Sequence, residues 1–179
     1  MEDLFVNNNN SFLGLDLGEK TLGIALSESG IIANNLKTIN FTQHKYEELL
    51  MPLKEVIEQF NIKTIILGNP KHMNNDVGIK AKISMEFQEK LQNNFPSVEV
   101  ILWDERLSTI QAFQAMNSSS GPKVSKNKQK KNKKLKDEIA AMIILQNFLN
   151  FRSNQLLEQQ QLAKKLEKKP KKTKKNKKR

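Results

Sequence analysis

The stretch FLGLDLGEKTLGIALSESG, residues 12–30, limits the choice of fold more than any other part of the chain. Its two short apolar runs, joined by Gly-Glu-Lys-Thr, predict a β-hairpin. Because side chains alternate along a strand, Asp16 shares a face with Phe12 and Gly14 and lies opposite the leucines. An aspartate within a buried strand is unfavourable unless it is hydrogen-bonded, paired or bound to a cation. Asp16 is therefore a candidate functional residue, although a turn-forming aspartate at a strand end has the same pattern.

The rest of the chain alternates predicted strands and helices. After the hairpin we expect a weaker strand at 31–39 and then an amphipathic helix at 46–60, which is kinked or restarts near Pro52. A buried strand at 63–67, a helix carrying Ile83, Phe87 and Leu91, and a strand at 98–103 follow. We then expect a short helix opened by Ser108 and a last helix from about Asp137 to about Phe151, which could extend toward Pro170. This order predicts an α/β fold, with hairpins first and parallel crossovers later.

The net charge of +11 over 179 residues is unevenly placed. Residues 164–179 carry +10 and residues 123–136 carry +8, which leaves the remainder at −7. Both basic segments have the composition of disorder. We therefore expect a disordered lead at 1–11, a domain at 12–152 with a flexible lysine-rich loop at 117–136, and a helical extension with a disordered tail at 153–179. The tail either solubilises the chain or binds nucleic acid or a ribosome surface.

Several classes of protein are excluded by composition. The chain has no cysteine, so disulfides and thiolate metal sites cannot form. No run approaches the roughly 20 apolar residues that span a bilayer, and the N-terminus lacks the features of a signal peptide. We expect a cytoplasmic protein without a membrane partner.

Acidic residues coincide with the ends of three predicted elements. Asp16 is near the end of the first strand, Asp104 and Glu105 follow the strand at 98–103, and Asp137 begins the last helix. In open α/β sheets the ligand crevice lies at the carboxyl ends of the strands. Crowded carboxylates repel unless divalent cations lie between them, and oxygen ligands without His or Cys favour Mg²⁺ or Mn²⁺. A pair of such ions about 4 Å apart could activate water against a phosphodiester.

Each acid also has a simpler interpretation. Asp104 could form a surface ion pair with Arg106, and Asp137 could be an N-cap. The coincidence of all three positions with the lysine-rich loop favours the metal site.

Four motifs, in this order and spacing, resemble the YqgF/RuvX family of Holliday-junction-resolvase-like proteins: GLDLGEKTLGIALS, ILGNP, LWDERLST and KDEIAAMIILQNFL. The likeness covers residues 12–150. It implies an RNase H-like fold, with a five-stranded mixed sheet and helices on both faces. It also implies a metal-dependent nuclease that matures the 5′ end of the small-subunit (16S) ribosomal RNA precursor. By that likeness the catalytic, metal-binding acids are Asp16, Glu105 and Asp137, with Asp104 as the alternative to Glu105.

The resemblance and the charge pattern together predict a surface for RNA, and for ribosomal particles that contain it. The residues expected to contact nucleic acid are Lys20, Arg106, Lys123, Lys126, Lys128, Lys130, Lys131, Lys133, Lys134 and Lys136. Two other functions remain open. A DNA resolvase for four-way junctions would use the same acids but needs a dimer, and a non-catalytic ribosome assembly factor would use the basic segments alone.

Overall fold

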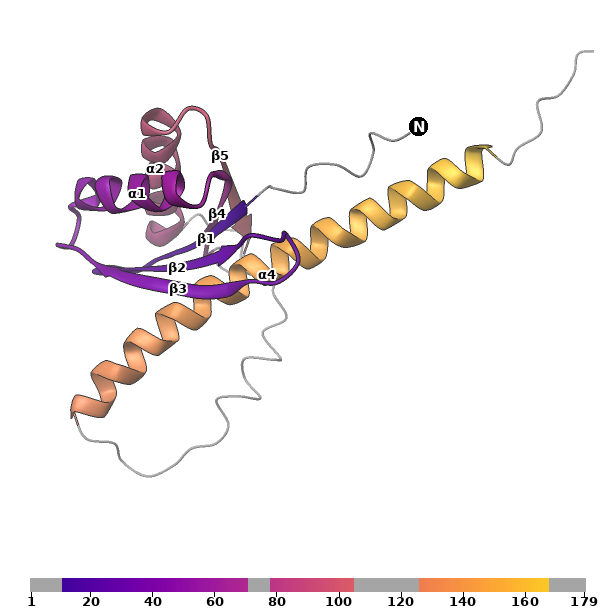
Figure 1. The fold of residues 1–179 in the computed structure, drawn as a ribbon. Helices are drawn as coiled ribbons and strands as arrows, with labels where there is room; N and C mark the ends of the chain where they lie inside the picture. The colour runs from indigo at the N-terminus through magenta and orange to yellow at the C-terminus, as the bar shows by residue number, and fades with distance from the viewer. Residues whose placement is uncertain (1–10, 71–77, 105–125, 168–179) are drawn as a thin grey trace, which may run out of the picture.

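The computed structural model describes residues 11–70, 78–104 and 126–167, with the backbone alone for 126–138 and 166–167 (Figure 1). The elements are β1 (Ser11–Leu17), β2 (Thr21–Ser27), β3 (Asn34–Asn40), the 3-10 helix η1 (Tyr46–Leu49), α1 (Leu50–Gln59), β4 (Ile62–Asn69), α2 (Ile79–Asn94), β5 (Glu99–Asp104) and α4 (Lys126–Glu167). The short helix expected at Ser108 lies outside the described residues. No helix among those described is both long and apolar enough to cross a bilayer.

The five strands form one mixed sheet in the order β3-β2-β1-β4-β5. β1 pairs antiparallel with β2, and β2 with β3, whereas β1, β4 and β5 run parallel. The predicted hairpin is confirmed, and the Gly18 amide donates to the Thr21 carbonyl oxygen at 2.8 Å to close its turn. Because β1, β4 and β5 are parallel, their carboxyl ends lie at one edge of the sheet.

Helices cover both faces of the sheet, as predicted (Figure 1). Alternation along β1 separates the two layers. Leu13 and Leu15 are fully buried in the core under α1 and α2, whereas Phe12 is buried in a second core under α4. The second core joins α4 to residues of four strands and to Ala33, which directly precedes β3: Phe12, Ala25, Ala33, Ile66, Trp103, Ala141, Ile144, Leu145, Phe148 and Leu149.

The predicted helix at 46–60 restarts near Pro52, which is one of the two alternatives that the sequence left open. The 3-10 turn η1 ends at Leu49, and α1 begins at Leu50. Pro52 therefore falls in the first turn of α1, where its missing N–H costs no intrahelical hydrogen bond.

The last helix is longer than predicted at its start. α4 begins at Lys126, not near Asp137, so residues 126–136 are helical where a flexible loop was expected. Lysine and glutamine are good helix formers, and adding residues to an existing helix is much easier than nucleating one. The remainder of that expected loop, residues 117–125, lies outside the described residues. At its other end α4 extends beyond the sheet, and residues 153–165 are all exposed (Figure 1).

Candidate functional site

Asp16 is the next-to-last residue of β1 and is half-buried on the face covered by α4. Its cross-strand partner in β2 is Gly23. On the other side Leu15 pairs with Leu67 of β4, so Gly68 is the next residue at the level of Asp16. Glycines on both neighbouring strands place no side chain beside Asp16 in the sheet, which leaves room for a ligand there.

Asp104 is the last residue of β5 and is also half-buried. Leu102 packs against the core under α1 and α2, whereas Trp103 is buried under α4. Alternation therefore places Asp104 on the α2 side of the sheet, opposite the face of Asp16. Two strand spacings, about 10 Å, separate β1 from β5. The structure brings both acids to one edge but not to one face.

Asn69, at the end of β4, is the register partner of Asp104. Its side chain is buried, and its Oδ1 atom has no hydrogen-bond partner among the described residues. The sequence indicated a turn for Gly68-Asn69-Pro70 and gave no sign of a buried amide. A buried carbonyl oxygen without a donor is unfavourable unless a ligand, ion or water satisfies it.

The donors at this edge are oxygen atoms on its two faces. Asp16 offers a carboxylate on the α4 side, whereas Asp104 and its register partner Asn69 offer a carboxylate and an unsatisfied amide oxygen on the α2 side. Mg²⁺ and Mn²⁺ prefer such oxygen ligands. Within the part of the chain whose side chains are described, no three His, Cys, Asp or Glu residues form a metal-binding cluster. A complete site would need the predicted ligand Glu105, which is outside the described residues, and Asp137, of which only the backbone is described.

The backbone of Asp137 can be compared in level with Asp16 through the packing of α4 on β1. The ring centroids of Phe12 and Phe148 lie 6.0 Å apart, and a Cβ added to Gly14 would lie 2.6 Å from the Leu145 Cβ. Residue numbers along α4 therefore fall as those along β1 rise. Two strand residues span about 6.7 Å, which is about 4.5 residues of helix. One such step from the two residues that Gly14 meets, Ala141 and Leu145, reaches the level of Asp16 at about residues 136–141 of α4, a range that contains Asp137.

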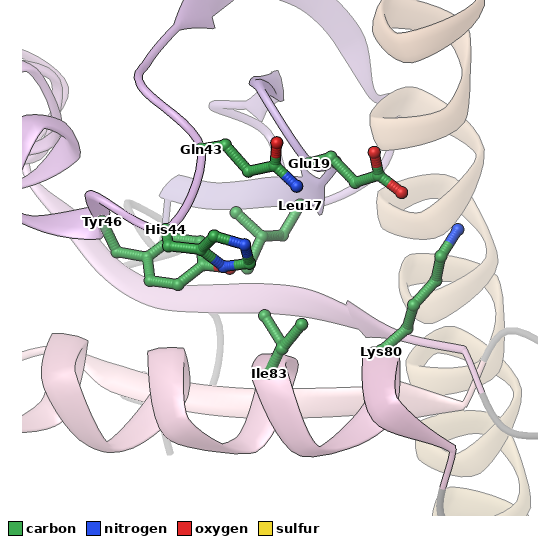
Figure 2. Close-up of a pocket in the computed structure, with 8 residues that line it drawn as sticks. Leu17, Glu19, Gln43, His44, Tyr46, Lys80 and Ile83 are labelled. Carbon is green, nitrogen blue, oxygen red and sulfur yellow. The ribbon is translucent and has the colours of Figure 1, made fainter.

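A pocket of about 60 Å³ opens at the same end of β1, on the α2 side (Figure 2). It is lined by Leu17, Gly18 and Glu19 from the hairpin, Gln43, His44 and Tyr46 from the segment after β3, and Lys80 and Ile83 from α2. Sequence reasoning missed this pocket because its walls come from three separate segments, and no motif links them.

The predicted nucleic-acid contacts are placed only in part. Lys20 is exposed in the hairpin turn, and its carbonyl oxygen accepts a hydrogen bond from the Phe41 amide at 3.0 Å. Seven predicted lysines lie in the first eleven residues of α4, with only the backbone described: Lys126, Lys128, Lys130, Lys131, Lys133, Lys134 and Lys136. Arg106 and Lys123 are outside the described residues.

A family model described as "RuvX: Holliday junction resolvase" matches residues 10–151. The chain belongs to the RuvX family. The predicted family is therefore confirmed, and so is the predicted α/β fold with a five-stranded mixed sheet and helices on both faces. The match ends at Phe151, so the exposed end of α4 and the lysine-rich residues after it lie outside the RuvX region.

Curated relatives support the same membership. A protein of Onion yellows phytoplasma named "Putative pre-16S rRNA nuclease" is 62% identical over 145 residues, covering 80% of this chain and 91% of the relative. A protein of the same name from Geobacillus sp. is 43% identical over 139 residues, covering 77% of this chain and 96% of that one. Among solved structures, RuvC of T. thermophilus in complex with a Holliday junction substrate aligns with a TM-score of 0.49 at 13% identity, over 79% of this chain and 96% of that chain.

Proposed function

We propose that this RuvX-family protein is a metal-dependent nuclease that hydrolyses RNA phosphodiesters and matures the 5′ end of pre-16S ribosomal RNA in the cytoplasm. The observation that carries the proposal is Asp16, a carboxylate in a buried strand, beside glycines and at the edge where three parallel strands end. An acid in that setting can be a ligand for a cation, because ligands bind at the carboxyl ends of the parallel strands in such sheets. Family membership and the names of the relatives supply the reaction and the RNA.

We assign the metal-binding acids as Asp16, Glu105 and Asp137. The choice of Glu105 over Asp104 follows from alternation in β5, because Asp104 shares the α2 side with Leu102. That side faces away from Asp16, and the longer side chain of Glu105 can reach farther than that of Asp104. The assignment of Asp137 is supported by the level of its backbone relative to Asp16.

These three carboxylates would hold one or two Mg²⁺ or Mn²⁺ ions. When bound, the ions supply an activated water and stabilise the charge that develops on the phosphodiester oxygens. The residues of the chain orient the substrate. The lysines of α4 would neutralise phosphates on the side of Asp137, and Lys20 would do so from the hairpin turn. Such contacts give affinity and little sequence preference.

Cleavage of a labelled pre-16S RNA fragment tests the proposal. The purified protein is assayed with Mg²⁺, Mn²⁺ or a chelator, beside Asp16→Asn, Glu105→Gln and Asp104→Asn. We expect the first two variants to lose at least about 100-fold in rate, and Asp104→Asn, whose side lies away from Asp16, to lose less than tenfold. Urea denaturation of each variant checks folding.

Two results would contradict parts of this proposal. Full activity of a folded Asp16→Asn protein would refute the proposed metal site. A larger loss of activity in Asp104→Asn than in Glu105→Gln would show that Asp104, and not Glu105, is the metal ligand.

A DNA resolvase is the second candidate function, because the matched family model is described as a Holliday junction resolvase. A four-way DNA junction in the same assay separates the two enzymes. If the protein cleaved only the DNA junction and were dimeric in solution, the DNA resolvase function would replace the proposed RNA nuclease function. Binding of RNA or ribosomal particles without cleavage of either substrate would favour an assembly factor.

A further inference from the structure

The pocket beside the β1 hairpin has an apolar floor and a polar rim (Figure 2). Leu17 and Ile83 lie inside it, with the Tyr46 ring forming one wall. Gln43 and Lys80 reach its rim from different elements, α2 in the case of Lys80. Small-molecule sites typically combine a mostly apolar surface with a few polar groups that fix orientation.

We infer that this pocket binds one unpaired nucleobase of the RNA strand, next to the phosphate that is cleaved at Asp16. The inference rests on the proposed nuclease function and adds to it a preference for the base at one position of the substrate.

The size of the pocket fits a single base. About 60 Å³ is open to water in it, and one water needs about 10–15 Å³ of such space. The pocket therefore has room for roughly four to six waters, or about 120–180 Å³ of liquid. That is enough for one flat heterocycle.

The charge of the rim favours a base over a phosphate. Glu19 and Lys80 both line the pocket, so its lining has one acidic and one basic residue rather than the cluster of basic residues that holds a phosphate. A neutral base presents donors and acceptors along one edge, and the Gln43 amide can both donate and accept. Unpaired RNA bases are recognised in this way, with aromatic or histidine rings against the base plane.

The wall next to Tyr46 is already held in place without a ligand. The Tyr46 ring packs between Phe41 and Phe87, with ring centroids 5.6 and 5.8 Å away. Burial raises the pKa of the Tyr46 phenol, and nearby Glu86 raises it further. A wall that does not need to be ordered on binding lowers the entropic cost of taking up a ligand.

The loop that carries His44 is also fixed. The Lys45 amide donates to the Thr42 carbonyl oxygen at 2.8 Å, and the Thr42 amide donates to Glu48 Oε2 at 2.8 Å. His44 is the third residue of this turn and has φ +68°, a conformation that residues other than glycine rarely adopt. The turn thus keeps the imidazole at the mouth of the pocket (Figure 2).

The pocket and Asp16 lie on the two faces of the same strand. Leu17 directly follows Asp16, so its side chain points to the α2 side. An RNA strand that crosses this edge of the sheet can present a phosphate to Asp16 and the adjacent base to the pocket.

Proton NMR tests base binding without any need for cleavage, since the chain has only two histidines. The His44→Gly variant identifies the His44 ring signals in the full-length protein. AMP, GMP, CMP and UMP are then titrated without metal, with ribose 5-phosphate as the control that lacks a base. We expect the His44 signals to shift with at least one nucleotide and not with ribose 5-phosphate. Equal shifts with ribose 5-phosphate would show that the pocket binds phosphate and not a base. If no nucleotide shifted the His44 signals, the inference that the pocket binds a base would be refuted.

Cleavage specificity supplies the second test. RNAs that differ in one base beside the cleavage site are compared for the wild type, Gln43→Ala and Gln59→Ala, an exposed glutamine at the end of α1 that serves as the matched control. We expect Gln43→Ala to reduce the preference at one position about three- to tenfold, the worth of one hydrogen bond. An unchanged preference in Gln43→Ala would overturn the inference. If the wild-type protein cleaved none of these RNAs, the proposed nuclease function would be contradicted. The NMR titration would then still show whether the pocket binds a base.

Discussion

Replacing Gly14 by alanine should push α4 away from the sheet. A Cβ at this position would lie 2.6 Å from the Leu145 Cβ and 2.9 Å from the Ala141 carbonyl oxygen. Neither atom can rotate away, because one is the first atom of a side chain and the other is main chain. The helix must therefore move as a body or the strand must bend.

The size of the effect follows from that distance. Ordinary contact begins near 3.4 Å, so α4 must withdraw by about 0.8 Å at Gly14. A gap of 0.5–1 Å forfeits about a quarter to a half of the dispersion energy of the contacts that it opens. Overpacking of a well-packed core costs about 1–3 kcal/mol, and we expect about 2 kcal/mol here. For a chain of this size, that lowers the melting temperature by roughly 4–8 °C.

Urea denaturation measures the loss as a lower midpoint at an unchanged slope. Gly18→Ala is the comparison variant, since its added Cβ meets only Thr21 of the same hairpin turn, at 2.8 Å from the hydroxyl and 3.0 Å from the carbonyl oxygen, and does not touch α4. We expect it to lose less stability than Gly14→Ala, because only the turn has to adjust. If Gly14→Ala matched the wild type within about 0.5 kcal/mol, α4 would not be seated on β1 as described.

Three further predictions concern α4 and the loop before α1. Phe148→Ala should lower the free energy of unfolding by about 3–5 kcal/mol, because its ring contacts two others in the core under α4, while the exposed Leu162→Ala should change it by less than about 0.5 kcal/mol; urea denaturation measures both. The Thr42 amide holds the pKa of Glu48 below its usual value, so the stability it contributes is complete above about pH 4.3 and is lost as the pH falls through the lowered folded-state pKa. As the pH is lowered from 6 to 3, the urea midpoint of Glu48→Gln should therefore fall less steeply than that of the wild type. Parallel profiles of the two proteins would refute the contact between Glu48 and the Thr42 amide. Serine replacements of lysines within 126–136 should flatten the salt dependence of RNA binding by about 0.7 per lost phosphate contact, and an unchanged slope would exclude this part of α4 from the interface.

The strands and their faces could be predicted from the sequence because apolar alternation is strong there. Leu13 and Leu15 face one core and Phe12 the other, as alternation requires. The start of α4 could not be predicted in the same way. Lysine-rich composition is typical of disorder, yet lysine is also a good helix former, and the well-packed turns after Ala141 supply the nucleus on which the basic turns extend.

The sequence predicted the acids and favoured Glu105 over Asp104 for its longer side chain, but it could not place Asp104 on a face of the sheet. A shift of one residue at the end of a strand moves a side chain to the opposite face, and strand ends are not predictable to one residue. The register of Asn69 with Asp104, together with the burial of Trp103, supplies the missing information. The pocket around His44 could not be predicted from the sequence for another reason. Its walls come together only because of how α2 is placed against the hairpin.

α4 connects the stability of the fold to the proposed chemistry. Ala141 and Leu145 are fully buried and seated on Gly14, and Asp137 precedes Ala141 by one turn. The distance between Asp137 and Asp16 is therefore set by packing that itself contains no functional group. A shift of α4 by about 0.8 Å would move the Asp137 backbone relative to Asp16 by more than the about 0.2 Å that metal–oxygen distances tolerate, and would weaken a cation held by the proposed ligands. Gly14→Ala should for that reason lose more activity than its loss of stability alone explains, whereas Gln43→Ala, on the far side of the sheet, should change the choice of base and leave the metal requirement intact.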